Sequence, residues 1–152
     1  MTDPVSFPDA TPRLALPLLY AAQVQKEFYV NEAHARLDSL LHCVVEGLAS
    51  AEPASPEEGD CWIVAAGAGG AFAGRDDQLA CRQAGQWVFV APVPGLRVYD
   101  QAAGHERRYF DVWTQTSAVA DASGGSTVDS EARTAINAIL AILRDNGTIP
   151  AN

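Results

Sequence analysis

Basic side chains are scarce in this chain. Its 152 residues include 10 Lys and Arg against 19 Asp and Glu, a formal net charge of -9 at pH 7. A surface this acidic repels the phosphate backbone of a nucleic acid, and the short Arg107-Arg108 pair does not reverse that repulsion. We therefore expect no nucleic acid partner.

Long apolar runs are missing too. No window approaches the roughly 18 consecutive apolar residues that a membrane-spanning helix needs. Residues 1–12, MTDPVSFPDATP, lack the basic start and apolar core of a secretory signal. We therefore expect a protein that is made in the cytoplasm and is not inserted into a membrane. Prolines at positions 4, 8, 12 and 17 make residues 1–17 an extended arm that cannot form a helix.

Cysteines are few and widely spaced. The chain has three, Cys43, Cys61 and Cys81, and no CxxC pair. This pattern offers neither a zinc knuckle nor a dithiol redox motif. We expect three reduced, mostly buried thiols.

Apolar residues at helical spacing predict a first helix over about residues 31–45. Asn31 is its expected N-cap, and Gly47 is expected to end it. Its apolar stripe would consist of Ala33, Leu37, Leu40, Leu41, Val44 and Leu48. The pattern leaves open whether residues 18–28 add a helical turn or form a loop.

After a loop rich in proline, glycine and acid, the period of the apolar residues becomes two-fold. Five short strands are predicted, each bounded by a turn signal: residues 61–65, 78–83, 86–92, 96–101 and 107–114. We predict an α+β fold, in which a small antiparallel β meander or barrel is capped by the N-terminal amphipathic helix and a C-terminal helix is separate. The expected order is a proline-rich arm (1–17), a helix plus β module (18–114), a Gly/Ser linker (115–127) and an oligomerisation or docking helix (128–147).

The last helix has the clearest helical signals in the chain. Ser126 and Asp129 match a capping pattern, and Asn146-Gly147 is expected to stop the helix. Its apolar stripe, the expected oligomerisation surface, comprises Ala132, Ile136, Ile139, Leu140 and Leu143. An isolated helix of this length is marginal in water, so the stripe must be buried either on the chain's own β module or on sister chains. Isoleucine at both core positions favours trimers or higher oligomers.

No pattern marks a catalytic or metal site. His34, Asp38 and His42 share one side of the first helix, and we interpret this row as a solvated rim rather than a metal site. The glycine-rich residues 67–74 fail the phosphate-loop pattern because Phe72 stands where the third glycine belongs, so we interpret them as a flexible hairpin loop. No serine lies in a GxSxG setting. We expect no catalytic residue, no metal and no cofactor.

Aromatic residues gather in the predicted β region. Most should belong to the core, and those left exposed would form a platform that binds sugar or protein. The candidate ligand-binding aromatics are Trp62, Trp87, Tyr99, Tyr109 and Trp113.

Several motifs occur in a fixed order from Pro12 onward. PRLALP is followed by QVQK, VNEA and RLD, and the β region contains PEEGD, a Gly-Ala-rich run and GQWVF. Together they resemble an uncharacterised domain family of alphaproteobacterial prophages and gene transfer agents, over about residues 11–113. Phe72 departs from the family pattern, which often has Trp there. Family members often continue into longer fibre sections, so we expect a base, adaptor or short spike role here.

The resemblance implies a structural component of a phage-like particle, such as a head spike, head fibre or tail fibre. Its expected partners are other capsid, spike or tail proteins and copies of itself, as a trimer or pentamer, in a virion or phage-like particle made in the bacterial cytoplasm. The resemblance also implies that the N-terminal arm docks on a neighbouring subunit through Leu14, Leu16, Leu18, Leu19 and Tyr20. The alternative function is a carbohydrate-binding module that contacts host-surface polysaccharide. An enzyme that uses the loop acids ranks last.

Overall fold

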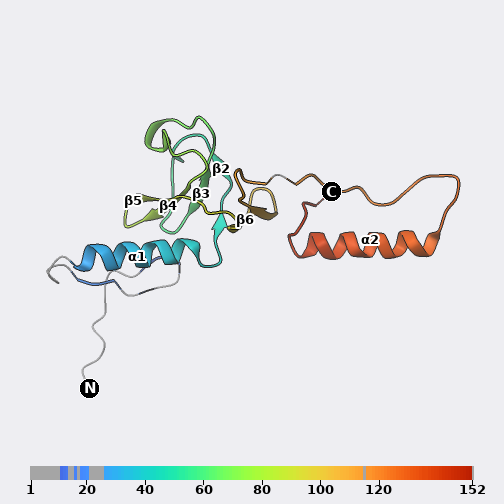
Figure 1. The fold of residues 1–152 in the computed structure, drawn as a ribbon, viewed down its shortest axis with the longest axis horizontal. Coiled ribbons are helices and arrows are strands. Elements are labelled where there is room, and N and C mark those ends of the chain that lie inside the picture. Colours follow the sequence, from blue (N-terminus) through green and yellow to red (C-terminus); the bar gives the residue numbers. More distant parts are fainter. Residues whose placement is uncertain (1–10, 14–15, 17, 21–25, 115, 152) are drawn as a thin grey trace, which may run out of the picture. The chain divides into compact units, whose positions relative to one another are not determined.

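The computed structural model describes residues 11–13, 16, 18–20, 26–114 and 116–151 (Figure 1). The chain divides into two compact units, Met1–Pro92 and Val93–Asn152. The described residues contain two α-helices and seven short strands, which confirms the predicted α+β class. The strands lie in two open sheets, so the barrel considered from the sequence is not formed.

The first helix, α1, spans Lys26–Leu40, so it begins and ends earlier than predicted. Asn31 lies inside this helix and is not its N-cap. The helix stops because His42 has a positive φ of 49°, and the β-branched pair that follows forms the short strand β1, Val44–Val45. The predicted apolar stripe is wrong: Leu37 is 48% exposed.

A four-stranded sheet with the order β2-β3-β4-β5 organises the first unit. Its strands are β2 (Leu48–Ala49), β3 (Cys61–Val64), β4 (Leu79–Gln83) and β5 (Gln86–Val90). The last three are antiparallel, as predicted. The short β2, which the sequence did not predict, runs parallel to β3. Ala84 and Gly85 join β4 to β5 with φ of 51° and 73°, the signs of a type I′ hairpin turn.

The glycine-rich connection between β3 and β4 carries a core residue. It contains a 3₁₀ turn, Gly70–Phe72, whose Phe72 side chain is fully buried. The Phe72 ring meets the Trp87 ring edge to face, with 5.0 Å between centroids, and the Phe89 ring at 5.8 Å. The interpretation of this segment as only a flexible loop therefore missed the residue that covers one face of the sheet.

Helix α1 runs beside the four-stranded sheet of the same unit (Figure 1). Successive side chains of a strand point to opposite faces of the sheet, so the neighbours of Trp62 on β3 and of Ala80 on β4 share the other face. These neighbours are Cys61, Ile63, Leu79 and Cys81, and each is at most 1% exposed. Gln83, at the end of β4, bonds to α1. The core of the first unit thus lies on both faces of one small sheet.

In the second unit, β6 (Arg97–Asp100) and β7 (His105–Arg108) form an antiparallel hairpin. The second helix, α2, spans Ser130–Asp145. Its N-cap is Asp129, whose side chain accepts a 2.9 Å hydrogen bond from the Ala132 amide, so Ser126 is not the cap. Gly147, with a φ of 65°, follows the helix at the predicted end.

Two sets of contacts hold α2 within its unit. At its end, the Gly147 carbonyl accepts a 2.7 Å hydrogen bond from the Glu106 amide of β7. Along its side, the preceding segment returns past the helix: Asn137 accepts from the Ala122 amide at 2.8 Å, and Arg144 donates to the Val119 carbonyl and to Asp121. The glycine-rich segment is thereby hydrogen-bonded to α2 over much of its length.

Candidate functional site

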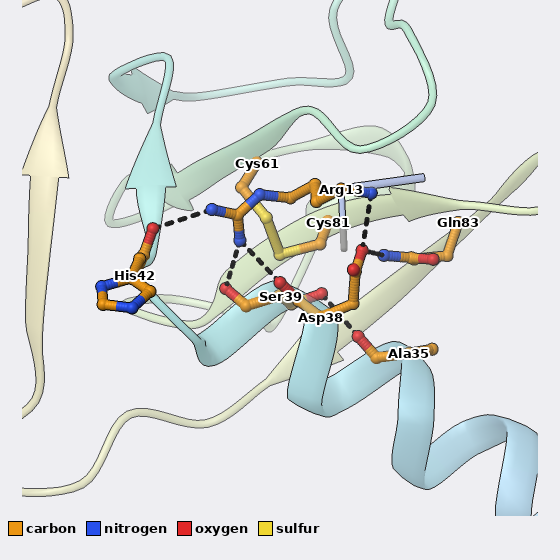
Figure 2. The surroundings of a disulfide bond; sticks show 8 residues. All are labelled: Arg13, Ala35, Asp38, Ser39, His42, Cys61, Cys81 and Gln83. Atoms are coloured by element: carbon orange, nitrogen blue, oxygen red, sulfur yellow. Dashed lines mark hydrogen bonds between the residues drawn. A yellow bond between two sulfur atoms is a disulfide. The ribbon is translucent and has the colours of Figure 1, made fainter. Parts of the chain in front are cut away.

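A buried carboxylate fastens the N-terminal segment to the first unit. Asp38 is 0% exposed. Its Oδ1 accepts a 2.8 Å hydrogen bond from the Thr11 hydroxyl. Its Oδ2 accepts from the Arg13 amide and from Gln83 Nε2, both at 3.1 Å (Figure 2). The interpretation of Asp38 as part of a solvated rim is therefore wrong. We call these four residues the N-terminal latch.

The Arg13 guanidinium completes the latch. It donates to the carbonyls of Asp38 at 2.6 Å, Ser39 at 3.2 Å and His42 at 2.7 Å (Figure 2). These carbonyls lie at the C-terminal end of α1, where backbone acceptors have no partner within a helix and a positive charge is favoured. Gly59 leaves room for this contact, since a Cβ there would lie 3.1 Å from Arg13 Cγ.

The predicted docking arm lies on its own helix where the structure describes it. Leu16, Leu18 and Leu19 are half-buried, and Tyr20 is 37% exposed. Asn31 of α1 accepts from the Leu19 amide at 2.7 Å and donates to the Leu19 carbonyl at 2.9 Å. Leu14 lies outside the described residues.

Two of the three cysteines form a disulfide bond, which corrects the expectation of three reduced thiols. Cys61 on β3 lies opposite Cys81 on β4, and their sulfur atoms are bonded (Figure 2). Neighbouring backbone bonds pair Asp60 with Arg82 and Val64 with Gln78. The cysteines therefore occupy a position between bonded pairs, where facing Cα atoms approach most closely. The signal that the sequence offered was one cysteine in each of two consecutive predicted strands, residues 61–65 and 78–83.

Cys43 remains a free, buried thiol. Burial raises the pKa of Cys43 from 9.0 to about 11, and the nearby positive charge of Arg13 opposes part of that rise. A thiol in this state stays protonated near neutral pH and is a poor nucleophile.

The candidate aromatics fall into two groups. In the first unit, Trp62 and Trp87 meet edge to face at 5.7 Å. The Trp87 indole N–H donates to Glu52 at 2.7 Å, and the Arg82 guanidinium lies 5.3 Å from the Trp87 ring centroid. Trp87 is thus largely engaged by its own unit, and Trp62, which is half-buried, is the ring better placed for a ligand.

The other three candidate aromatics belong to the second unit. Tyr109 and Trp113 pack edge to face at 5.3 Å, and Trp113 is only 6% exposed. Tyr99 is 40% exposed and lies over Gly147. Trp113 therefore belongs to the core of this unit, and Tyr99 braces the end of α2.

The predicted apolar stripe of α2 faces outward. No residue of this helix is buried. Ile136 is 47% exposed, Ile139 57% and Ile142 58%. Leu140 and Leu143 are half-buried, while Ala132 is exposed. We call the predicted set together with Ile142 the α2 stripe: Ala132, Ile136, Ile139, Leu140, Ile142 and Leu143.

The described part of the chain offers neither a metal centre nor a membrane-spanning helix. There, no group of three or more His, Cys, Asp or Glu side chains is arranged to hold a metal ion. The same residues include no helix with the length and apolar character needed to cross a membrane.

A family model described as "Protein of unknown function (DUF2793)" matches residues 30–114. The searches of curated proteins and of solved structures returned no match. The matched residues include α1 from Val30 onward, the four-stranded sheet and the β6–β7 hairpin.

Proposed function

The chain belongs to the DUF2793 family, and on that premise we propose that it is a structural component of a phage-like particle that assembles through α2. A head spike, head fibre or tail fibre base of a phage or gene transfer agent fits this role. The phage or gene transfer agent origin rests on the likeness of its ordered motifs to a prophage domain family. The observation that carries the assembly role is the exposed α2 stripe.

The α2 stripe has the composition of a self-association surface. Ile136, Ile139 and Leu143 follow the spacing of coiled-coil core positions, and the flanking Leu140 and Ile142 widen the apolar face. A wide seam with isoleucine at both core positions favours three or more strands over two. Burying the three exposed isoleucines would contribute about 1.5–3 kcal/mol each before the ordering cost is counted.

The charges around α2 favour contact between copies. Arg144 is engaged by Asp121 and the Val119 carbonyl, and Arg133 by the Gly124 carbonyl. Both cations thus point to the returning segment and away from the stripe. Sister helices can therefore approach without burying an unpaired charge, which would be costly.

The contact of α2 with its hairpin supports the same role. A helix anchored at its C-terminal end by the Glu106–Gly147 hydrogen bond presents its stripe in a fixed direction relative to β6 and β7. Fixed presentation reduces the ordering cost of association. Since the described arm residues lie on their own helix, α2 rather than the arm is the assembly contact that we propose.

The first experiment measures native mass by light scattering after gel filtration. We expect the native mass of the full chain to be three times that of the Ile136→Asp/Ile139→Asp variant, as a trimeric α2 contact requires. Ala138→Asp/Ala141→Asp is the matched control, because it places the same residues at the same spacing on the opposite, exposed side of α2. The assembly role is overturned if the full chain is monomeric, or if both variants have the same mass.

The particle role needs a separate experiment. Tagged chain expressed in a producer cell should co-sediment with phage-like particles in a density gradient, and the Ile136→Asp/Ile139→Asp variant should not. Recovery of the wild-type chain only at the top of the gradient would contradict incorporation while leaving self-association intact.

A second candidate function is carbohydrate binding, favoured by the adjacent, half-buried Trp62 and Trp87 rings. Flat indole rings stack on the apolar faces of sugars. A glycan array should then show binding that Trp62→Ala removes and that Phe110→Ala, an exposed aromatic of the second unit, retains. No binding at millimolar sugar would contradict this function.

A further inference from the structure

Helix α1 has its apolar side chains on the outside. Tyr29 is 78% exposed, Leu37 48% and Leu41 46%. They recur at every fourth position with Ala33 between them, so they lie along one side of the helix. We call Tyr29, Ala33, Leu37 and Leu41 the α1 ridge.

Two polar side chains on the opposite side of α1 are hydrogen-bonded within the chain. Asp38 binds the latch residues, and Asn31 binds the backbone of Leu19. Ordinary surface helices have the reverse arrangement, with the apolar side toward the core. The α1 ridge therefore contributes little to folding the described residues, and its exposed area is of the kind that marks interaction surfaces.

The ridge contains a hollow with the geometry of a helix-packing hole. Tyr29, Glu32, Ala33 and Arg36 line it. These residues stand at i, i+3, i+4 and i+7, which are the four positions that surround a knob from a facing helix in coiled-coil packing. Ala33 forms its small floor, and an ion pair of 2.6 Å between Arg36 and Glu32 holds its rim.

We propose that the α1 ridge packs against the α1 ridge of a second copy, antiparallel and across a two-fold axis. Leu37 of each copy then enters the hollow around Ala33 of the other. The same register places Tyr29 opposite Leu41. Near the two-fold axis the large Leu37 thus faces the small Ala33, and at the two ends of the contact Tyr29 faces Leu41. Each copy uses the same surface, as an isologous contact requires.

Charge is also complementary in this register. Each copy brings one Glu32 and one Arg36 to the edge of the contact, and both side chains are about half exposed. In the antiparallel pair, Glu32 lies within reach of the Arg36 of the second copy as well as its own. The two Glu32 and two Arg36 side chains have a net charge of zero and lie at the solvated edge of the contact. There they favour one register of the two helices without a large desolvation cost.

This contact is independent of the α2 contact proposed above. The two surfaces lie on different compact units of the chain, so each can be disabled alone. A rival occupant of the α1 hollow is the α2 stripe of a neighbouring copy, whose exposed isoleucines could also act as knobs. The test below separates these two arrangements.

The register predicts which pair of new cysteines can be bonded between copies. Full-length Ala33→Cys, carrying an affinity tag, is mixed with untagged Leu37→Cys and oxidised mildly, so that homodimers and heterodimers differ in mass. We expect the heterodimer to be the main product on a non-reducing gel. The mixture of Tyr29→Cys with Leu37→Cys, one helical turn out of register, should give several-fold less.

Two results of these cysteine oxidations would overturn the proposal. One is equal yield from both mixtures, and the other is preferential bonding of Ala33→Cys to Ile139→Cys of α2.

As a second measurement, Leu37→Asp should halve the native mass, whereas Val112→Asp, at an exposed apolar residue outside both helices, should leave it unchanged. An unchanged mass for Leu37→Asp would also overturn the proposal. The Ile136→Asp/Ile139→Asp variant should still give the Ala33–Leu37 product, so failure of the α2 contact is distinguished from failure of this one.

Discussion

The side-chain amide of Gln83 donates a 3.1 Å hydrogen bond to the carboxylate of Asp38, 45 positions earlier in the chain. The same carboxylate accepts from Thr11 and from the Arg13 backbone. One buried side chain therefore joins the N-terminal segment, α1 and β4. A cluster of this kind is stable only when every member has a partner.

Removing the Asp38 carboxylate should destabilise the first unit strongly. Asp38→Ala leaves the donors of Thr11, Arg13 and Gln83 without their buried acceptor, at a cost of about 1–3 kcal/mol for each unsatisfied group. We expect a loss of about 3 kcal/mol or more in the free energy of unfolding, measured by chemical denaturation. Glu32→Ala, which breaks the exposed ion pair with Arg36, should cost less than about 1 kcal/mol. Equal midpoints for wild type and Asp38→Ala would contradict the role of the latch.

The disulfide should contribute a comparable amount. It closes a segment with a sequence separation of 20, for which the chain-entropy relation gives about 3 kcal/mol. Cys61→Ala/Cys81→Ala should lower the free energy of unfolding by that amount. A reductant should bring the wild type to a similar value and leave the double variant unchanged. The Cys43→Ala variant should keep its response to the reductant, and loss of that response would contradict the assigned pairing.

Cys43 should make stability depend on alkaline pH. Its pKa is raised from 9.0 to about 11, so above pH 9.0 the unfolded chain releases a proton that the folded protein retains. The resulting stabilisation is present in full below pH 9.0 and is lost as the pH rises through about 11. We expect a decline of about 2–3 kcal/mol over that range, from ~1.4 kcal/mol for each pKa unit.

Comparison with Cys43→Ala isolates this effect, because tyrosines that ionise over the same range are common to both proteins. The difference in unfolding free energy between wild type and variant should shrink between pH 8 and pH 11. A constant difference would contradict the raised pKa. In the folded wild type, alkylation of Cys43 should remain slow at pH 8.

The parts of the fold predicted correctly depend on local chemistry. The first residues of β3, β4, β5 and β6 lie within one position of the predicted starts, because turn residues beside the strands, such as Ala84-Gly85, restrict the backbone directly. The stop of α2 at Gly147 has the same origin. The strands β1 and β2 were missed because each has only two residues, too few to show a two-fold apolar period. They are strands only because they pair with neighbouring strands.

The parts that were missed depend on distant partners. The spacing of Leu37 and Leu41 predicts an inward stripe, but Asp38 is drawn inward by Thr11, Arg13 and Gln83, and the helix is turned about its axis accordingly. The Cys61–Cys81 bond requires the register of β3 on β4, which composition does not contain. The α2 stripe was predicted because its period lies within one helix, yet its exposure could be known only from the fold.

The end of α2 gives a prediction that separates backbone strain from crowding. Gly147 has a φ of 65°, and a Cβ there would lie 2.8 Å from Tyr99 Cε2. Gly147→Ala should lower the free energy of unfolding by about 1–2 kcal/mol, the backbone part being about 1 kcal/mol. In a Tyr99→Ala background only the backbone part should remain, because the crowding atom is gone. A double-mutant cycle measures the difference. An equal cost in both backgrounds would show that Tyr99 moves aside freely, and no cost in either would show that Gly147 does not fix the end of the helix.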